Sequence, residues 1–231
     1  EGGDTAFLDD PGSEEEASQP APPRTELELE DVSREVGLDF RHGAFRWSVS
    51  PDPAAMMGGG VCWLDYDSDG WLDLFAVNSY SEAETTRWES EGGLPESALF
   101  RNDEGEFVDV SEESGANLAV RGNGCVAADF DLDGNTDLYV TTARVNALLW
   151  NEGDGTFTEG AVEAGVAGYD WRSGASVGDV NGDGWPDLFV AGYAAMQNPN
   201  QNATLGFPNT YFGVRDLLFL SDGASGGGRP T

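Results

Sequence analysis

Aspartates recur along this chain in one spacing that could hold a metal ion. They occupy the first, third, fifth and ninth positions of a nine-residue segment that has glycine at its sixth position, except that asparagine takes the third position in one copy. The segment reads DYDSDGWLD at 65–73, DFDLDGNTD at 129–137 and DVNGDGWPD at 179–187. We call these segments loops 1, 2 and 3. Alternate side chains of a tight loop point inward, and the glycine permits the reversal, so the oxygens of each loop should converge on one centre.

Calcium is the ion that this arrangement favours. Ca²⁺ takes six to eight hard oxygen ligands, and dense carboxylates with a backbone carbonyl supply them. We expect about three calcium ions, one per loop, with position 7 contributing its backbone carbonyl. Loop 3 has asparagine at position 3, so it should bind more weakly. The expected metal-site residues are Asp65, Asp67, Asp69, Trp71, Asp73, Asp129, Asp131, Asp133, Asn135, Asp137, Asp179, Asn181, Asp183, Trp185 and Asp187.

Other interpretations of the loops fit less well. An EF-hand loop needs an acidic residue at position 12, where this chain has Ala76, Val140 and Val190. The loops contain no histidine or cysteine, which argues against zinc, and Mg²⁺ prefers fewer protein ligands and more water. An acidic hairpin turn without metal is the remaining alternative. Three matches in one register argue against it, because close carboxylates without a cation repel one another.

The segments around the loops indicate β-strands. An apolar run precedes each loop and another follows it, and a second repeated segment begins at Ala98, Ala147 and Asp216. These runs are short, rich in β-branched and aromatic residues, and separated by turn residues. Each repeat therefore predicts four strands, which is the content of one β-propeller blade. We expect an all-β chain of about three blades, a partial or split propeller that is incomplete at its C-terminus.

The two ends and two inserts complete the predicted organisation. Residues 1–25 are acidic and rich in Pro, Gly and Ser, which predicts a disordered leader before the propeller blades at 26–231. LEDVSREVGL, residues 29–38, repeats part of the second segment and is expected to add an outer strand. The inserts at 79–96 and 194–214 are polar and are expected to be surface loops. The second contains a glycosylation sequon at Asn202.

The charge of the chain excludes some partners. The formal net charge is −32, with 43 acidic residues against 11 arginines and no lysine. Such a surface disfavours nucleic acid and anionic membranes, which need basic residues. No segment approaches the length of a membrane-spanning helix, so we expect no membrane insertion. Three calcium ions would leave a net charge of about −26, so a high-salt, halophilic source is a reasonable expectation.

No residue constellation predicts catalysis. His42 is the single histidine, without a paired nucleophile, and a structural role is expected for it. The tryptophans near the loops are expected to pack between blades, although they could stack on sugars. Cys62 and Cys125 differ by one residue in their distance from the following loop, so they should point from opposite strand faces. Adjacent blades meet through opposite faces, which allows a disulfide, while two simply buried cysteines remain the alternative.

The loops followed by DLFV, with LFRN and GEFVDVSEESG between them, resemble FG-GAP/VCBS repeats, which integrin α-subunits carry with related calcium loops. The stretch from EDVSREVGLDFRHG to MMGGGVCWLDYDSDGWLDLFAVN is similar to bacterial and archaeal proteins related to cartilage acidic protein. This resemblance implies a calcium-binding β-propeller and an extracellular or cell-surface location. It also implies about seven blades, whereas three loops are found.

The functional expectation is a non-enzymatic, calcium-binding extracellular propeller that serves as an adhesion, binding or structural module. A protein or glycan partner is expected, with no nucleic acid. Two alternatives remain at this point. The chain could be a subunit of a larger assembly or fibre that another chain completes, or the propeller portion of a glycan- or lipid-acting hydrolase.

Overall fold

A computed structural model describes residues 28–44, 46–47, 52–199, 211–221 and 223. The chain divides into two units, Glu1–Val32 and Ser33–Thr231. The predicted leader at 1–25 lies outside the described residues. In the first unit, residues 28–32 take part in no strand. Everything below concerns the second unit unless stated.

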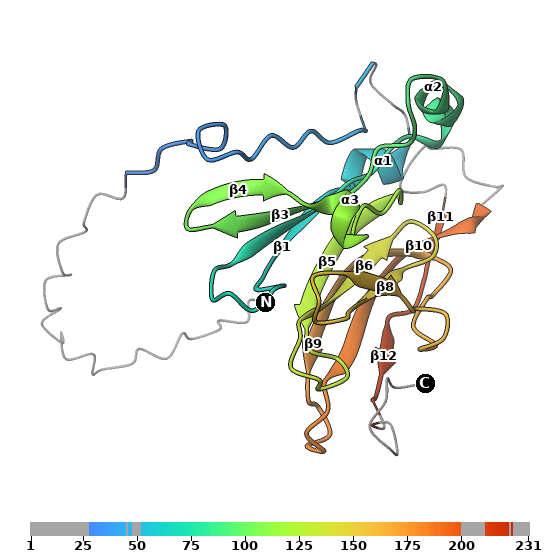
Figure 1. Ribbon diagram of the computed structural model, residues 1–231. Coiled ribbons are helices and arrows are strands. Elements are labelled where there is room, and N and C mark those ends of the chain that lie inside the picture. Colours follow the sequence, from blue (N-terminus) through green and yellow to red (C-terminus); the bar gives the residue numbers. More distant parts are fainter. Residues whose placement is uncertain (1–27, 45, 48–51, 200–210, 222, 224–231) are drawn as a thin grey trace, which may run out of the picture. The chain divides into compact units, whose positions relative to one another are not determined.

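The second unit contains three antiparallel sheets, which we call blades 1, 2 and 3 (Figure 1). The strands neighbour one another in the order β1-β2-β3-β4 in blade 1, β5-β6-β7-β8 in blade 2 and β9-β10-β12 in blade 3, where β11 pairs with the far end of β10. The strands are β1 (Gly60–Leu64), β2 (Asp73–Val77), β3 (Ala98–Asp103), β4 (Glu106–Asp109), β5 (Gly122–Ala128), β6 (Asp137–Thr142), β7 (Ala147–Asn151), β8 (Phe157–Glu159), β9 (Trp171–Gly178), β10 (Asp187–Pro199), β11 (Tyr211–Gly213) and β12 (Leu217–Phe219).

The all-β prediction with four-stranded blades is thereby confirmed for blades 1 and 2. Both blades have all four predicted strands. Blade 3 has its first three, and no fourth strand pairs with β12 among the described residues. The described helices are all short, and none is long and apolar enough to cross a membrane.

Side-chain alternation along the inner strands builds the core between blades. On β5, Cys125 and Ala127 pack toward blade 1, while Val126 and Ala128 pack toward blade 3. Successive side chains of a strand point to opposite faces, so one strand supplies both interfaces. Blade 2 therefore buries one face against blade 1 and the other against blade 3.

The single disulfide of the described chain joins blades 1 and 2. Cys62 on β1 and Cys125 on β5 are bonded, with their Cα atoms 6.0 Å apart. The offset of one residue between the two cysteines does place them on facing sides of adjacent blades. Of the two alternatives left by the sequence, the structure contains the disulfide.

A short turn ending in glycine recurs before each blade. It closes through the hydrogen bonds from Leu38 N to Ser33 O (2.8 Å), from Ala116 N to Ser111 O (3.0 Å) and from Val166 N to Ala161 O (2.9 Å). Its glycine adopts positive φ in all three copies, at Gly37 (91°), Gly115 (73°) and Gly165 (71°). In the second copy the turn contains the helix α3 (Ser111–Ser114).

The predicted N-terminal outer strand at 29–38 is wrong in this structure. The repeated letters DVSREVGL form the recurring turn at residues 33–37, and the described residues before it, 28–32, form no strand. A strand exists only through ladder hydrogen bonds to a neighbour, and none of residues 28–32 takes part in a ladder. The repeat in the sequence is real, but residues 28–32 pair with no neighbouring strand and therefore form no strand themselves.

The first insert is more ordered than the predicted surface loop. It contains η1 (Glu82–Glu84) and α2 (Thr85–Ser90), and Trp88 of α2 is buried. Of the second insert, β10 extends to Pro199 and β11 occupies Tyr211–Gly213. The sequon at Asn202 lies outside the described residues.

A buried arginine ties the first insert to the helix α1 (Pro53–Met57). Arg121 Nη2 lies 2.6 Å from Asp52 Oδ1, and its Nη1 lies 3.1 Å from Glu82 Oε2. Asp52 also caps α1 by accepting the N–H of Ala54 at 3.1 Å. Because the guanidinium is buried, it needs both carboxylates, and the pairing holds α1 and η1 against β5.

The tryptophans divide between core and surface. Trp171 is buried, with its ring centroid 4.7 Å from that of Tyr193, in a core cluster that also contains Ala143 next to β6 of blade 2, in agreement with the expected packing between blades. Trp63 and Trp71 are exposed, contrary to the expected core packing. Trp63 lies on the face of β1 opposite Cys62, which is the face of blade 1 that no described blade covers.

Candidate metal centre

Each aspartate loop connects the first two strands of its blade. Loop 1 joins β1 to β2, loop 2 joins β5 to β6, and loop 3 joins β9 to β10. The strand pairs are in register up to the loop, since Leu64 pairs with Asp73 and Ala128 with Asp137. Position 9 of each loop is therefore also the first residue of the second strand, which fixes its side chain relative to position 1.

Backbone hydrogen bonds to position 1 give the loops their shape. Asp65 accepts the N–H groups of Asp69 and Gly70, both at 3.1 Å. In loop 2 the corresponding bonds to Asp129 are 3.1 and 2.9 Å, and in loop 3 those to Asp179 are 3.2 and 2.9 Å. The same carboxylate therefore organises the same turn three times.

Two positions in each loop have left-handed backbone. Position 6 is glycine in every loop, with φ between 91° and 96°. Position 4 also has positive φ, at Ser68 (59°), Leu132 (56°) and Gly182 (78°). Leucine rarely adopts this conformation, so loop 2 keeps a local strain that its hydrogen bonds must overcome.

The aspartate at position 9 is buried and binds backbone on both sides. Asp73 accepts the N–H of Tyr66 at 2.9 Å and that of Asn102 at 2.8 Å. Asp137 accepts the N–H of Phe130 at 2.9 Å and that of Asn151 at 2.8 Å. Asp187 does the same in loop 3, with Val180 and Ser221. Each position 9 thus joins the loop, the second strand and the end of the third strand.

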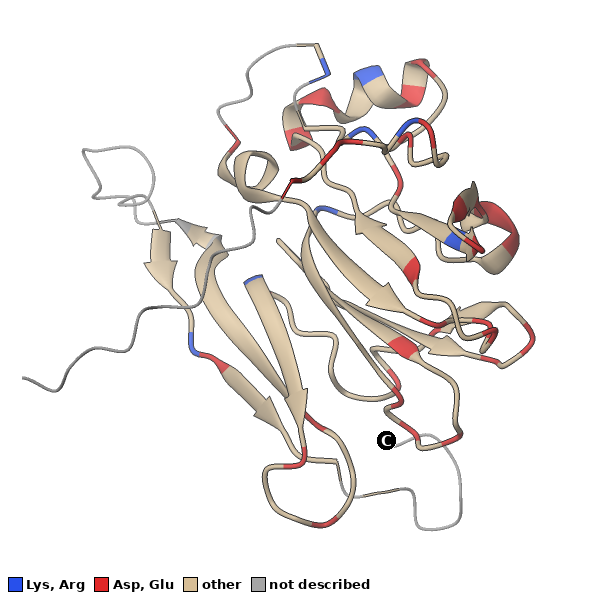
Figure 2. Cartoon of the chain, turned by 90° about the vertical axis from the view of Figure 1, so that its left-hand side faces the viewer, with Lys and Arg blue, Asp and Glu red and all other residues tan. Residues whose placement is uncertain are grey.

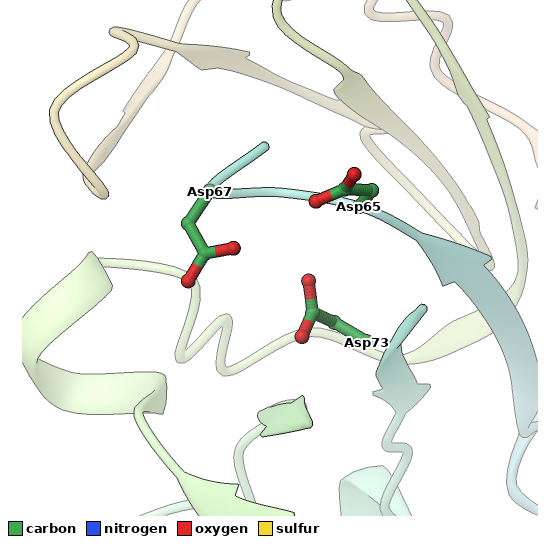
Figure 3. A group of neighbouring side chains, drawn as sticks. All are labelled: Asp65, Asp67 and Asp73. Atoms are coloured by element: carbon green, nitrogen blue, oxygen red, sulfur yellow. The ribbon is translucent and has the colours of Figure 1, made fainter. Parts of the chain in front are cut away.

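Two groups of three carboxylates come close enough to share a metal ion. Asp65, Asp67 and Asp73 each place one oxygen within 4.8 Å of the others, and Figure 3 shows the three side chains around a common space. Asp129, Asp131 and Asp137 form the same group in loop 2. Positions 1, 3 and 9 of these loops therefore converge as the spacing predicts.

The remaining expected ligands are placed differently. Asp69 and Asp133 lie outside these groups, and one oxygen of each accepts the N–H of position 7, from Trp71 and Asn135 respectively, at 2.8 Å. In loop 3 no group of three acidic side chains converges among the described residues. There Asn181 Nδ2 donates to Asp183 at 2.8 Å, which engages two of the expected ligands with each other. The backbone carbonyls of position 7 stay predicted ligands.

Burial raises the pKa of the position 9 carboxyls. The pKa of Asp73 rises to about 6 and that of Asp137 to about 7, because burial disfavours their charged forms more than their two N–H partners favour them. The neighbouring aspartates at positions 3 and 5 raise both pKa values further. In loop 3, by contrast, hydrogen bonds from backbone N–H groups, chiefly that of Gly184, hold the pKa of exposed Asp179 below its usual value.

This charge distribution fits a bound cation. A buried carboxylate with two further carboxylates beside it is costly to ionise alone, and a divalent cation removes that cost. The three oxygens are hard donors, and exposed positions of the loop leave room for water or backbone oxygen. Figure 2 shows acidic residues along these loops, with few basic residues nearby. Loops 1 and 2 can hold a metal ion, and loop 3 is the weaker candidate.

Two asparagines complete the site and were not anticipated from the sequence. Asn102 Nδ2 donates to Leu72 O at 3.0 Å, and Asn151 Nδ2 donates to Thr136 O at 3.1 Å. Both therefore hold position 8 of their loop from the end of the third strand. Asn151 also donates to Tyr66 O at 2.7 Å, which links loop 1 to blade 2. The repeated Asn in LFRN and LLWN was the available signal.

His42 packs against the chain. Its Nδ1 accepts the N–H of Ala44 at 3.3 Å, and its ring lies beside Gly59. Burial lowers its pKa, so the imidazole is neutral.

Comparison with known proteins agrees with this architecture. The FG-GAP-like repeat family matches residues 65–140 and again residues 129–190, so the matches begin at loops 1 and 2 and together span more than half of the chain. A search of curated proteins finds no significant match. The resemblance to cartilage acidic protein therefore stays a prediction. The repeated loops, the four-stranded blades and this match lead to one conclusion, which is that the chain belongs to the FG-GAP-like repeat family.

Proposed function

We propose that this chain is a calcium-stabilised propeller module of an extracellular protein, and that it serves in adhesion, binding or structure. The observation that carries the proposal is the convergence of positions 1, 3 and 9 in loops 1 and 2, with position 9 buried. We assign Ca²⁺ to both sites because a dense set of carboxylate oxygens in a flexible loop suits its size and coordination number. Loop 3 would take a third ion more weakly.

The proposed role of calcium is structural. Position 9 begins the second strand and accepts hydrogen bonds from its loop and from the third strand, so an ion held there joins the loop to the sheet. An ion that binds only the folded chain stabilises it by about 2.7 kcal/mol at a hundredfold excess over its dissociation constant. The loops would keep the blade ends rigid, and recognition would take place elsewhere on the blades.

An extracellular location is supported by two features. The disulfide between Cys62 and Cys125 requires an oxidising compartment to persist. Repeats of this family are also typical of extracellular and surface proteins. We propose a protein or glycan as the partner, and a binding role without catalysis, for which the packing of His42 is the supporting observation.

Calorimetric titration of the full chain tests the assignment. Calcium should bind two or three sites and raise the melting temperature, and Mg²⁺ should do so far less. Asp131→Asn gives loop 2 the asparagine that loop 3 has at position 3 and should weaken calcium binding at that site, whereas Asp103→Asn removes the same charge from exposed β3 outside the loops and should leave binding unchanged. Absence of calcium heat together with an unchanged melting temperature would refute the proposal.

A further inference from the structure

Loops 1 and 2 are connected through one buried side chain, that of Asn151. Its Nδ2 donates to Tyr66 O at 2.7 Å and to Thr136 O at 3.1 Å, which are backbone oxygens of loop 1 and loop 2 respectively. The amide nitrogen has two hydrogens, and these bonds use both. Asn151 is the last residue of β7 and is 1% exposed. Water therefore cannot replace a bond that is lost here, and losing one leaves a buried polar group unpaired.

Both bonds end beside the converging carboxylates. Tyr66 is position 2 of loop 1, so it lies between the carboxylates at positions 1 and 3. Thr136 is position 8 of loop 2, directly before Asp137, and Asp137 accepts the N–H of Asn151 at 2.8 Å. A change in the geometry of either group of carboxylates must therefore move a partner of Asn151.

The turn at residues 152–156, which we call the bridging turn, contacts both loops as well. A Cβ on Gly153 would lie 2.8 Å from Nδ2 of Asn135, which is position 7 of loop 2. On its other side the bridging turn lines a polar cavity of about 510 Å³ together with Tyr66 of loop 1. Phe157, directly after the turn, stacks on the Tyr66 ring with ring centroids 6.2 Å apart. These contacts give the two loops a second connection beside that of Asn151.

Among the described residues, the counterparts of Asn151 in the other two blades reach only their own loop. Asn102 Nδ2 donates to Leu72 O of loop 1, and its second hydrogen has no partner there. Ser221 donates its N–H to Asp187 of loop 3, but a hydroxyl carries a single hydrogen and cannot join two carbonyl oxygens. The connection is therefore particular to loops 1 and 2.

A loop without an ion should hold this connection less well. Close carboxylates repel one another without a cation, so the loop departs from the observed geometry for part of the time. When loop 1 does so, Tyr66 O leaves Asn151, and the hold of the same amide on Thr136 O weakens. Order in one loop thereby favours order in the other, and a site that is already ordered loses less entropy on binding.

We propose that Asn151 is a positioning residue that couples the metal sites of loops 1 and 2, so that filling one loop raises the affinity of the other. The inference rests on the proposed binding of calcium and adds that these two loops fill cooperatively, with loop 3 outside the coupled pair. Each site must change the affinity of the other by the same factor. One buried hydrogen bond corresponds to roughly three- to tenfold in affinity.

Calorimetric calcium titration of the full chain measures this factor at high, constant salt, which screens the charge differences between variants. All chains carry Asp179→Ala/Asp183→Ala, which disables loop 3. Adding Asp65→Ala/Asp67→Ala disables loop 1 and should lower the affinity of loop 2 by roughly three- to tenfold. The same change at positions 1 and 3 of loop 2 should lower the affinity of loop 1 by the same factor.

Asn151→Asp and Asn102→Asp form a matched pair that assigns the coupling to its residue. Each removes the amide that holds position 8 of its loop and adds the same charge, and each keeps the oxygen that accepts the N–H of Gly153 or Gly105. Only Asn151→Asp removes a bond between loops. In its background, disabling loop 1 should change the affinity of loop 2 by less than about twofold, while the full factor should persist with Asn102→Asp. A merely structural role would change stability in both variants but not this ratio.

Amide hydrogen exchange tests the coupling without a variant of Asn151. In the chain with loop 2 disabled, calcium fills only loop 1, yet it should slow exchange of the Phe130 N–H, which Asp137 accepts in loop 2. Unchanged exchange there, an affinity of loop 2 that ignores loop 1, or equal factors in both asparagine variants would overturn the coupling and leave the assignment of calcium intact. A chain that binds no calcium at all would refute the proposed function and this inference with it.

Discussion

Reduction of the disulfide between Cys62 and Cys125 should destabilise the chain substantially. The chain has only these two cysteines, so a reductant changes no other bond. The bond joins the innermost strands of blades 1 and 2, and both sulfurs lie in the core between these blades. Reduction should therefore destabilise the folded chain mainly by giving the unfolded chain more conformational freedom.

The magnitude follows from the 63 residues that separate the two cysteines. In the chain-entropy description, a closed loop of that length removes roughly 14 cal/mol/K from the unfolded ensemble, which is about 4 kcal/mol at room temperature. Measured values for native disulfides are typically about 2–5 kcal/mol. We therefore expect the free energy of unfolding to fall by about 2–4 kcal/mol on reduction.

Urea unfolding followed by tryptophan fluorescence measures this difference, with calcium held constant. Oxidised and reduced chains are compared, and a Cys62→Ala/Cys125→Ala double variant serves as a control that should not respond to the reductant. Equal unfolding free energies for oxidised and reduced chains, within about 0.5 kcal/mol, would refute the reasoning. Two free thiols in the oxidised protein would refute the bond itself.

Three further predictions concern the loops and the buried arginine. Because burial raises the pKa of Asp73 to about 6 and that of Asp137 to about 7, the folded metal-free chain holds protons that the unfolded chain releases. Its stability should therefore fall as pH rises from about 4 to 7, and calcium should stabilise it more at neutral than at acidic pH, as melting temperatures with and without calcium would show. A metal-free melting temperature that rises over this range would contradict this. Leu132→Gly should raise the free energy of unfolding by about 0.5–1 kcal/mol in urea titrations, because it relieves positive φ, and Leu72→Gly should lower it instead. Arg121→Met should lower the free energy of unfolding by about 3 kcal/mol in the same assay, since it removes the buried partner of two carboxylates. A decrease below about 1 kcal/mol would show that these ion pairs contribute little to stability.

Much of the fold followed from local patterns. The spacing of the aspartates marked the turn between the first two strands of each blade, because only a tight loop with glycine at position 6 brings alternate side chains together. The short apolar runs beside each loop marked the strands, since a continuous apolar run suits a sheet that is buried on both faces. Even the facing of Cys62 and Cys125 followed from a one-residue offset.

The errors came from features that need a partner elsewhere in the chain. Residues 29–38 repeat the letters of a strand and a turn, yet only the turn forms, because its hydrogen bonds are local while a strand requires a neighbouring strand. The first insert contains the helix α2, whose Trp88 is buried, and the polar composition of the insert did not predict this burial. Trp63 is exposed because no described blade covers its side of blade 1.

The metal centre combines features that local sequence predicts with features that depend on contacts between distant segments. The sequence by itself determined which nine residues form each loop and which oxygens are available, because these depend on spacing along one short segment. Only the tertiary structure decided that position 9 is buried and that Asn102 and Asn151 hold it from another strand. Burial and long-range hydrogen bonds depend on neighbours contributed by distant segments, and no local spacing encodes them.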